Sequence, residues 1–226
     1  MGRYRRKLME VQKVSRIKRK KLFCFSFFLI VFLLITQQQA SITEAKAVKT
    51  KAESAIIVDV DSGKVLYAKN ENEALPPASM TKMMTEYIVL DQIAQGALEW
   101  ESTTEISDYA YSISANDDFS GVGLRQNVDY TVLELYEAMA INSDNATTIA
   151  LAEMIAGSEG AFVEMMNAKG EEMGLTDYKF VNSTGLDNTS LDGNHPEGTK
   201  ADDTNLLSAR AAALLAYHLI DRKSVV

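Results

Sequence analysis

Two residues in this sequence of 226 residues have the spacing of a nucleophile and its base, Ser79 and Lys82. They belong to the stretch Ala-Ser-Met-Thr-Lys, which follows a pair of prolines and opens a run of apolar residues with helical spacing. Residues three apart lie on one face of a helix, so the hydroxyl and the amine come within hydrogen-bond reach. A lysine held neutral by burial can take the serine proton. The pair therefore predicts a serine nucleophile activated by a lysine base.

A second polar motif, Ser143-Asp144-Asn145, falls between two predicted helices. The Ser-x-x-Lys pattern is common by itself and also occurs at Ser15 in the basic N-terminus, so this second motif matters. Its hydroxyl and carboxamide could face Ser79 and handle a proton and a carbonyl group. Residues 114–116 also fit Ser-x-Asn, but they lie in a polar loop, and we prefer Ser143. An ordinary turn or helix cap is the alternative for either triplet.

The element that must position Ser79 is a helix from about residue 79 to Gly96, preceded by a β-hairpin. The hairpin is predicted over residues 55–60 and 65–68, because two β-rich apolar runs flank the turn sequence Asp-Ser-Gly-Lys. Helical spacing in the nucleophile segment predicts a set of core residues rather than a ligand set. They are Met80, Met83, Met84, Tyr87, Ile88 and Ile93.

The remaining predicted elements carry local start and stop signals. Residues 99–130 are polar and irregular, and Thr131 and Glu134 form a capping box that begins the next helix. A glycine ends a helix where it follows the last periodic residue. We expect helices at 131–142, 146–156, 158–174 and 209–220, an extended piece at 178–181, and a long loop at 182–205.

The first 47 residues predict an export signal. A basic segment precedes an apolar run over residues 22–35, which suits a signal peptide better than a membrane span, and Ala45-Lys46-Ala47 offers a cleavage pattern. An uncleaved anchor is the alternative. The rest of the chain has 12 basic and 29 acidic residues, a net charge of −17, which argues against nucleic acid as a partner. Cys24, the only cysteine, lies in the signal, so no disulfide or thiol chemistry is expected beyond it.

The last six residues, 221–226, follow a predicted amphipathic helix without a capping glycine or a further element. We interpret them as a non-native tail and expect the gene to continue beyond Ile220.

The sequence resembles the penicillin-interacting serine peptidases, in particular the low-molecular-weight D-alanyl-D-alanine carboxypeptidases of Bacillus-like bacteria. The resemblance covers residues 54–220 and includes the Ser79 and Ser143 motifs. It also includes the stretches 156–159, 166–169, 174–186 and 195–199. It implies an α/β (α+β) fold of the β-lactamase and DD-peptidase type, with a helical subdomain and an incomplete antiparallel sheet.

The resemblance also implies roles and partners. Ser79 is the acyl-ester nucleophile, Lys82 the general base, Ser143 a proton relay, and Asn145 a residue that orients Lys82 and the substrate amide. The implied substrate is a peptidoglycan stem pentapeptide that loses its terminal D-Ala through an acyl-enzyme. β-Lactam antibiotics are further implied partners, and no cofactor or metal is implied. The implied location is secreted or extracytoplasmic, at the cell wall–membrane face of a Gram-positive bacterium.

The family's third motif, Lys-Thr-Gly or Lys-Ser-Gly, does not occur in the sequence. We therefore interpret residues 48–220 as a partial catalytic domain without that motif and the C-terminal β domain. A C-terminal membrane helix would also be missing, so membrane association is expected only through the signal or that helix. Losing an oxyanion donor costs about two to three orders of magnitude in rate. We expect the 226-residue chain itself to be unstable and inactive.

Three other functions are less well supported by the sequence. A serine β-lactamase of class A needs a deacylating glutamate, and residues 178–182 contain no carboxylate. A non-catalytic penicillin-binding or wall-binding module is compatible with the missing third motif. A Ser-His-Asp hydrolase would need His195 or His218, which we expect to be structural or solvated, and the two give a poor metal site. Calcium binding at residues 187–197 is a minor option.

Overall fold

A computed structural model describes residues 49–191 and 193–223 of the chain, with side chains described up to Ile220. The predicted signal over residues 1–47, with its cleavage site and Cys24, lies outside the described residues. So do residues 224–226 of the predicted tail, while the backbone of the last helix runs to Lys223. Among the described residues, no helix has the length and apolar character that crossing a membrane requires.

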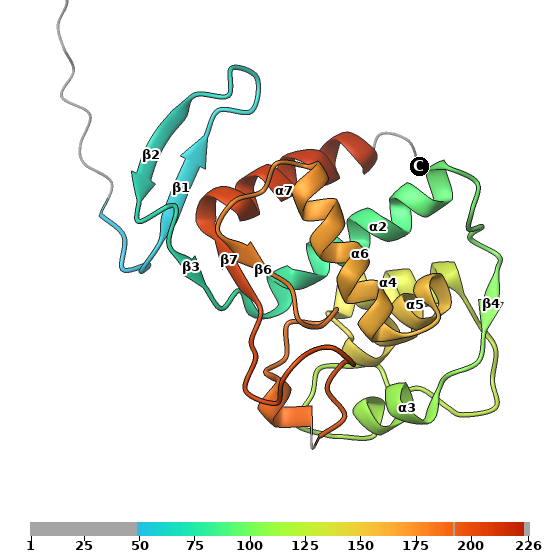
Figure 1. Ribbon diagram of the computed structural model, residues 1–226. Helices are drawn as coiled ribbons and strands as arrows, with labels where there is room; N and C mark the ends of the chain where they lie inside the picture. Colours follow the sequence, from blue (N-terminus) through green and yellow to red (C-terminus); the bar gives the residue numbers. More distant parts are fainter. Residues whose placement is uncertain (1–48, 192, 224–226) are drawn as a thin grey trace, which may run out of the picture. The chain divides into compact units, whose positions relative to one another are not determined.

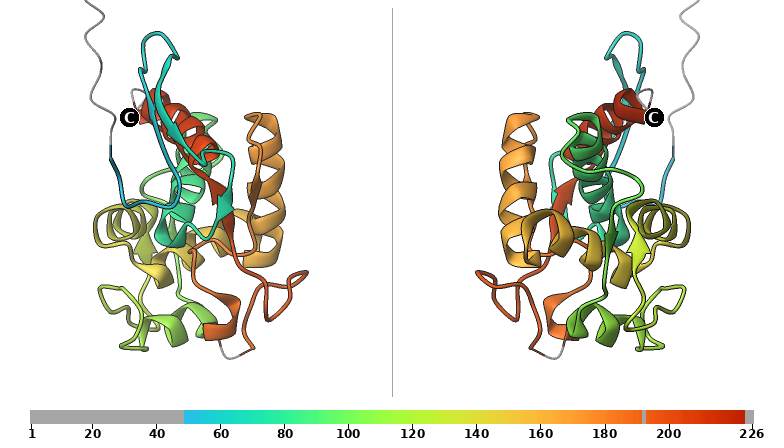
Figure 2. Two further views of the ribbon diagram at one scale, coloured as in Figure 1. Left: turned by 90° about the vertical axis from the view of Figure 1, so that its left-hand side faces the viewer. Right: turned by 90° about the vertical axis from the view of Figure 1, so that its right-hand side faces the viewer.

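The helix that carries Lys82, α2 (Lys82–Ala94), lies at the centre of the helical part. It packs against α4 (Val132–Asn142), α5 (Asn145–Ala156), α6 (Glu159–Glu172) and α7 (Ala209–Lys223). A short helix, α3 (Asp108–Ser114), packs on α5 (Figures 1 and 2). Because other helices surround it on several sides, α2 is buried along most of its length.

Two hydrophobic clusters meet at α2. One cluster joins Met84 and Ile88 of α2 to Phe162 of α6 and Leu215 of α7. The other joins Val89 of α2 to buried residues of α3, α4 and α5. Because α2 contributes to both clusters, its N-terminal turn, where Lys82 lies, is fixed relative to α5 and α6.

The sheets are antiparallel and short. Strand β1 (Ala55–Val58) pairs with β2 (Val65–Lys69), which confirms the predicted hairpin, and Gly63 in the turn has a φ of 67°. A three-stranded sheet has the order β3 (Ala74–Leu75), β7 (Leu206–Ser208) and β6 (Tyr178–Lys179). Strand β4 (Thr103–Thr104) pairs with β5 (Tyr130–Thr131). Strand β3 leads to Ser79, and strand β6 leads to residues 180–185. Because both strands pair with β7 in one sheet, the two segments that follow them lie close together.

The predicted helix boundaries are confirmed where caps define them. The capping box of Thr131 and Glu134 is present at the start of α4. Gly157, with a φ of 81°, ends α5, and the Ser158 side chain caps α6 by accepting the backbone N–H of Ala161. Side-chain caps satisfy N–H groups that the first turn leaves free, so these signals act locally and can be predicted from neighbouring residues.

Several predictions were wrong. Ser79 lies in a 3-10 turn, η1 (Ala78–Thr81), rather than in the first turn of the α-helix. The wider angular step of that turn carries Met80 out of the predicted core, and it is 52% exposed. Helix α3 lies in the segment that was predicted to be irregular, where the Ser107 side chain caps it. The strands β3 and β7 and a 3-10 turn, η2 (Asn188–Leu191), were also missed.

Candidate active site

Lys82 and Ser79 form the centre of the site. The Lys82 Nζ lies 3.1 Å from Ser79 Oγ, 2.8 Å from Asn145 Oδ1 and 2.9 Å from the backbone oxygen of Thr184. The lysine is 3% exposed, whereas Ser79 is open to solvent. A substrate can therefore reach the hydroxyl while the amine stays shielded from water.

The surroundings of Lys82 favour its neutral form. Burial lowers the pKa of Lys82 from 10.5 to about 8, and the nearby Asp144 carboxylate offsets part of this effect by favouring the ammonium. A pKa near 8 leaves a substantial neutral fraction close to physiological pH, as a general base requires.

The three neighbours of Lys82 also fix the direction of its lone pair. A neutral amine has two N–H bonds and one lone pair. Asn145 Oδ1 and the Thr184 carbonyl oxygen can only accept hydrogen bonds, so the two N–H bonds point at them. The lone pair is then left facing Ser79 Oγ, which is the geometry needed to remove the serine proton.

Asn145 is positioned by the cap of α5. Its backbone N–H and its Nδ2 both donate to the Ser120 carbonyl oxygen at 3.1 Å. The neighbouring Asp144 caps the helix, because its Oδ1 accepts the Thr147 N–H at 2.9 Å and its Oδ2 accepts the Val122 N–H at 2.7 Å. Asp144 is thus a helix cap, and Asn145, which follows it, contacts Lys82, so the cap alternative and the functional prediction are compatible.

Ser143 ends α4 in the left-handed conformation, with a φ of 56°. It is half-buried, and within the described part of the chain its hydroxyl makes no hydrogen bond. Its role as a proton relay therefore stays a prediction. The competing triplet was predicted to lie in a polar loop, but it forms the end of α3. Ser114 Oγ accepts the Leu124 N–H at 2.6 Å, and Asn116 Oδ1 accepts the Asp118 N–H at 3.0 Å.

The segment 182–185 is the part of the site that the sequence did not reveal. It supplies the Thr184 carbonyl to Lys82, and Gly185, with a φ of 90°, packs against the turn that carries Ser79. A Cβ on Gly185 would lie 2.0 Å from the Ala78 carbonyl oxygen, so only glycine fits. A backbone oxygen carries no residue signature, which is why pattern reasoning missed Thr184.

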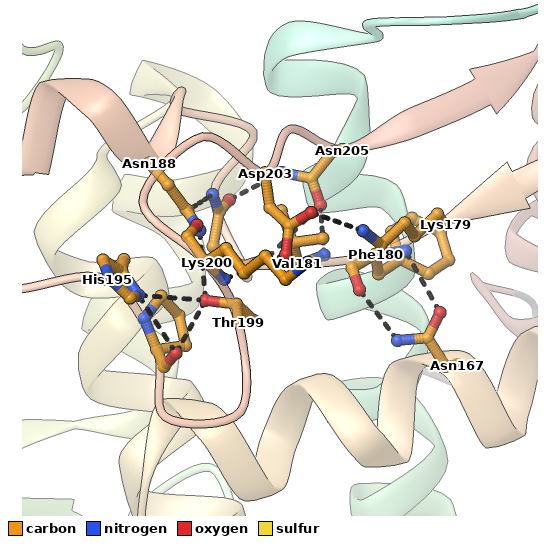
Figure 3. Close-up of polar contacts among 12 residues, drawn as sticks. Asn167, Lys179, Phe180, Val181, Asn188, His195, Thr199, Lys200, Asp203 and Asn205 are labelled. Carbon is orange, nitrogen blue, oxygen red and sulfur yellow. Dashed lines mark hydrogen bonds and ion pairs between the residues drawn. The ribbon is translucent and has the colours of Figure 1, made fainter.

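Buried asparagines hold this segment and the loop that follows it. Asn182 Oδ1 accepts the N–H groups of Thr184 and Gly185, and its Nδ2 donates to Asn188 Oδ1 at 3.0 Å. Asn205 Nδ2 donates to Asn182 Oδ1. Asn205 Oδ1 accepts the Val181 N–H, and both residues are labelled in Figure 3. Side chains therefore satisfy backbone N–H groups where the long loop predicted from its composition begins.

The histidines have no part in the centre. His195 Nδ1 lies 3.2 Å from Thr199 Oγ1 in the loop, and the His218 ring lies edge-on to Tyr87, with ring centroids 6.5 Å apart. The described residues contain no group of three or more His, Cys, Asp or Glu side chains that could hold a metal ion.

An exposed serine beside a buried lysine of lowered pKa, which also contacts an asparagine, is the arrangement that serine acyl transfer by a Ser-Lys pair requires. A family model described as D-alanyl-D-alanine carboxypeptidase matches residues 39–225. The chain belongs to this family, which confirms the resemblance seen in the sequence.

Individual relatives agree in sequence and in fold. The chain is 37% identical over 166 residues to the D-alanyl-D-alanine carboxypeptidase DacF of Bacillus subtilis, covering 71% of the chain and 42% of that protein. The crystal structure of the peptidoglycan synthesis regulatory factor PBP3 of Streptococcus pneumoniae is 40% identical, with a TM-score of 0.75 over 79% of the chain and 50% of that protein.

Penicillin binding protein 5 of Haemophilus influenzae is 30% identical, with a TM-score of 0.68 over 78% of the chain and 47% of that protein. The predicted fold of the DD-peptidase type is therefore confirmed. The chain spans about half the length, or less, of these relatives.

Proposed function

We propose that the protein removes the terminal D-Ala from peptidoglycan stem pentapeptides as a serine-type D-alanyl-D-alanine carboxypeptidase. The observation that carries the proposal is the Lys82 Nζ, which bridges Ser79 Oγ and Asn145 Oδ1 in a chain of this family. The named activity of DacF, a relative at 37% identity, supports it.

The chemistry proceeds in two stages through an acyl-enzyme. The neutral Lys82 amine takes the proton as Ser79 Oγ bonds to the carbonyl carbon of the penultimate D-Ala. The C–N bond then breaks, and the proton passes from the Lys82 ammonium through Ser143 to the leaving D-Ala amine, which leaves Lys82 neutral again. Water, deprotonated by the same base, attacks the ester, and Ser79 leaves with a proton as its hydroxyl is restored.

The backbone supplies part of the transition-state stabilisation in this scheme. The Ser79 N–H is one donor for the developing oxyanion at the start of η1. Asn145 orients the amide of the substrate while it holds Lys82. The second donor and the group that binds the substrate carboxylate belong to the Lys-Thr-Gly motif in the family, and this sequence does not contain that motif.

β-Lactam antibiotics are proposed as further ligands, because their strained amide imitates D-Ala-D-Ala and would leave an acyl group on Ser79. The name of penicillin binding protein 5, a relative at 30% identity, supports this part. An extracytoplasmic location at the cell wall–membrane face is proposed from the signal-like residues 1–47 and from the substrate.

Release of D-Ala from a peptide that ends in D-Ala-D-Ala tests the proposal. The full-length gene product should release D-Ala, and the matched Ser79→Ala variant should release none. Equal release by the variant would contradict the proposal. Penicillin binding that persists in Ser79→Ala without D-Ala release would favour the non-catalytic module, and rapid turnover of a chromogenic cephalosporin would favour a β-lactamase.

A further inference from the structure

Glu159 is a buried carboxylate that the proposed reaction does not use. It is 4% exposed and is the first residue of α6, next to the Ser158 cap. Its Oε1 accepts the N–H of Ser183 at 2.9 Å and the hydroxyl of Ser183 at 2.6 Å, and its Oε2 accepts the Tyr109 hydroxyl at 3.2 Å. A buried carboxylate is costly unless such donors compensate it.

The residue that Glu159 holds is directly attached to the site. The backbone oxygen of Ser183 accepts the Thr85 hydroxyl at 2.9 Å, and the oxygen of the next residue, Thr184, accepts Lys82 Nζ at 2.9 Å. Thr85 and Lys82 are three residues apart on α2 and so share one face. The segment 183–184 therefore lies along the first turn of α2, between that turn and the carboxylate on α6.

The position of the Thr184 carbonyl decides how Lys82 can act. With its two N–H bonds on Asn145 Oδ1 and on that carbonyl, the neutral amine turns its lone pair to Ser79. If the carbonyl moved away, the amine could rotate, and water could enter beside it. The side chain of Thr184 is not involved, because the contact is made by its backbone.

We propose that Glu159 is a positioning residue for Lys82, which acts through Ser183 to hold the Thr184 carbonyl in the place that directs the amine at Ser79. The inference rests on the proposed function in one respect, the role of Lys82 as the base. Burial raises the pKa of Glu159, and the hydrogen bonds from Ser183 and Tyr109 oppose that rise. Its place in the first turn of α6 also favours the anion.

The titration of Lys82 in the full-length protein tests the inference without any need for catalysis. Its side chain is followed by ¹³C NMR of lysine-labelled protein and assigned by the signal that disappears in Lys82→Met. In Glu159→Ala the loosened segment admits water, which replaces the lost acceptor and favours the ammonium. We expect the pKa of Lys82 to rise by about one pH unit.

Three further variants separate positioning from general stability. Glu159→Gln keeps an oxygen for Ser183 and should restore most of the low pKa of Lys82. Glu164→Gln makes the same change at an exposed site of α6 and should leave that pKa unaltered. Ser183→Ala removes one of the two hydrogen bonds to Oε1 and should raise the pKa by about half a unit.

The outcomes are distinct. A folded Glu159→Ala protein in which Lys82 titrates as in the wild type would overturn the inference. If Glu159→Ala does not fold, Ser183→Ala decides in the same way. A wild-type Lys82 that titrates near 10.5 would overturn the base role, and the inference with it. A wild-type value near 8 that no variant moves leaves the proposed function standing and overturns only the role of Glu159.

Discussion

Gly185→Ala should disrupt the site by a backbone clash. Gly185 has a φ of 90°, and an added Cβ would lie 2.0 Å from the carbonyl oxygen of Ala78 and 2.4 Å from its carbon. Ordinary contacts begin at 3.4 Å, so the loop and the turn that carries Ser79 must separate by about 1.4 Å. Such a shift takes the Thr184 carbonyl out of hydrogen-bond distance from Lys82, where it now lies at 2.9 Å.

The expected cost can be added up from these changes. The left-handed backbone conformation costs alanine about 1–2 kcal/mol. Loss of the hydrogen bond from Lys82 costs about 2 kcal/mol, and loss of the bond from Thr85 to the Ser183 carbonyl costs about 1 kcal/mol. The free energy of unfolding should therefore fall by about 4–5 kcal/mol in Gly185→Ala.

Gly198→Ala is the matched control for this experiment. Gly198 lies in the same long loop with a φ of 83°, but nothing lies within 4 Å of an added Cβ. It should therefore show the conformational cost alone, about 1–2 kcal/mol. Urea denaturation of the wild type and the two variants, followed by circular dichroism, gives the loss in the free energy of unfolding for each variant. Equal losses of stability in the two variants would refute the close packing of Gly185 on the Ser79 turn.

Three more predictions concern the base and the loop that holds it. The rate of acylation by penicillin should rise about tenfold per pH unit below pH 8 and level off above it, since only the neutral form of Lys82, whose pKa is about 8, accepts the serine proton. An acylation rate that does not change between pH 6 and pH 9 would contradict this. Asp144→Asn removes the negative charge that favours the ammonium form of Lys82 and should lower the pKa of Lys82 further, as measured by ¹³C NMR titration. A rise in the pKa of Lys82 would show instead that Asp144 acts mainly through its helix cap. Asn182→Ala removes a buried side chain that forms hydrogen bonds through both its oxygen and its nitrogen, and it should lower the free energy of unfolding, measured by urea denaturation, by about 3 kcal/mol or more. The control Asn194→Ala changes an exposed residue and should lower it by less than about 0.5 kcal/mol. Similar losses in the two variants would contradict the central place of Asn182 in the loop.

Features encoded by neighbouring residues could be predicted from the sequence. The capping box of Thr131 and Glu134, the stop at Gly157 and the cap at Ser158 each involve groups within one helical turn. The contact of Ser79 with Lys82 is also local, because the two residues are three apart. Physical rules for helix ends and helix faces are sufficient for features of this kind.

Features that depend on distant partners could not be predicted in this way. The two-residue strand β3 exists because β7, more than 130 residues later, pairs with it, and neither is long enough to show an alternating pattern. Glu159 and Ser183 are 24 residues apart, and nothing in either sequence neighbourhood indicates the other. The Thr184 carbonyl contributes through the backbone, which every residue has.

The central claim is that Ser79 is acylated with Lys82 as its base. Mass spectrometry of the full-length gene product after incubation with penicillin, followed by mapping of the modified peptide, tests it most directly. We expect one covalent penicilloyl group, located on Ser79, and its loss in Ser79→Ala and in Lys82→Met. A folded full-length protein that stays unmodified, or one that is modified at another residue, would contradict the account.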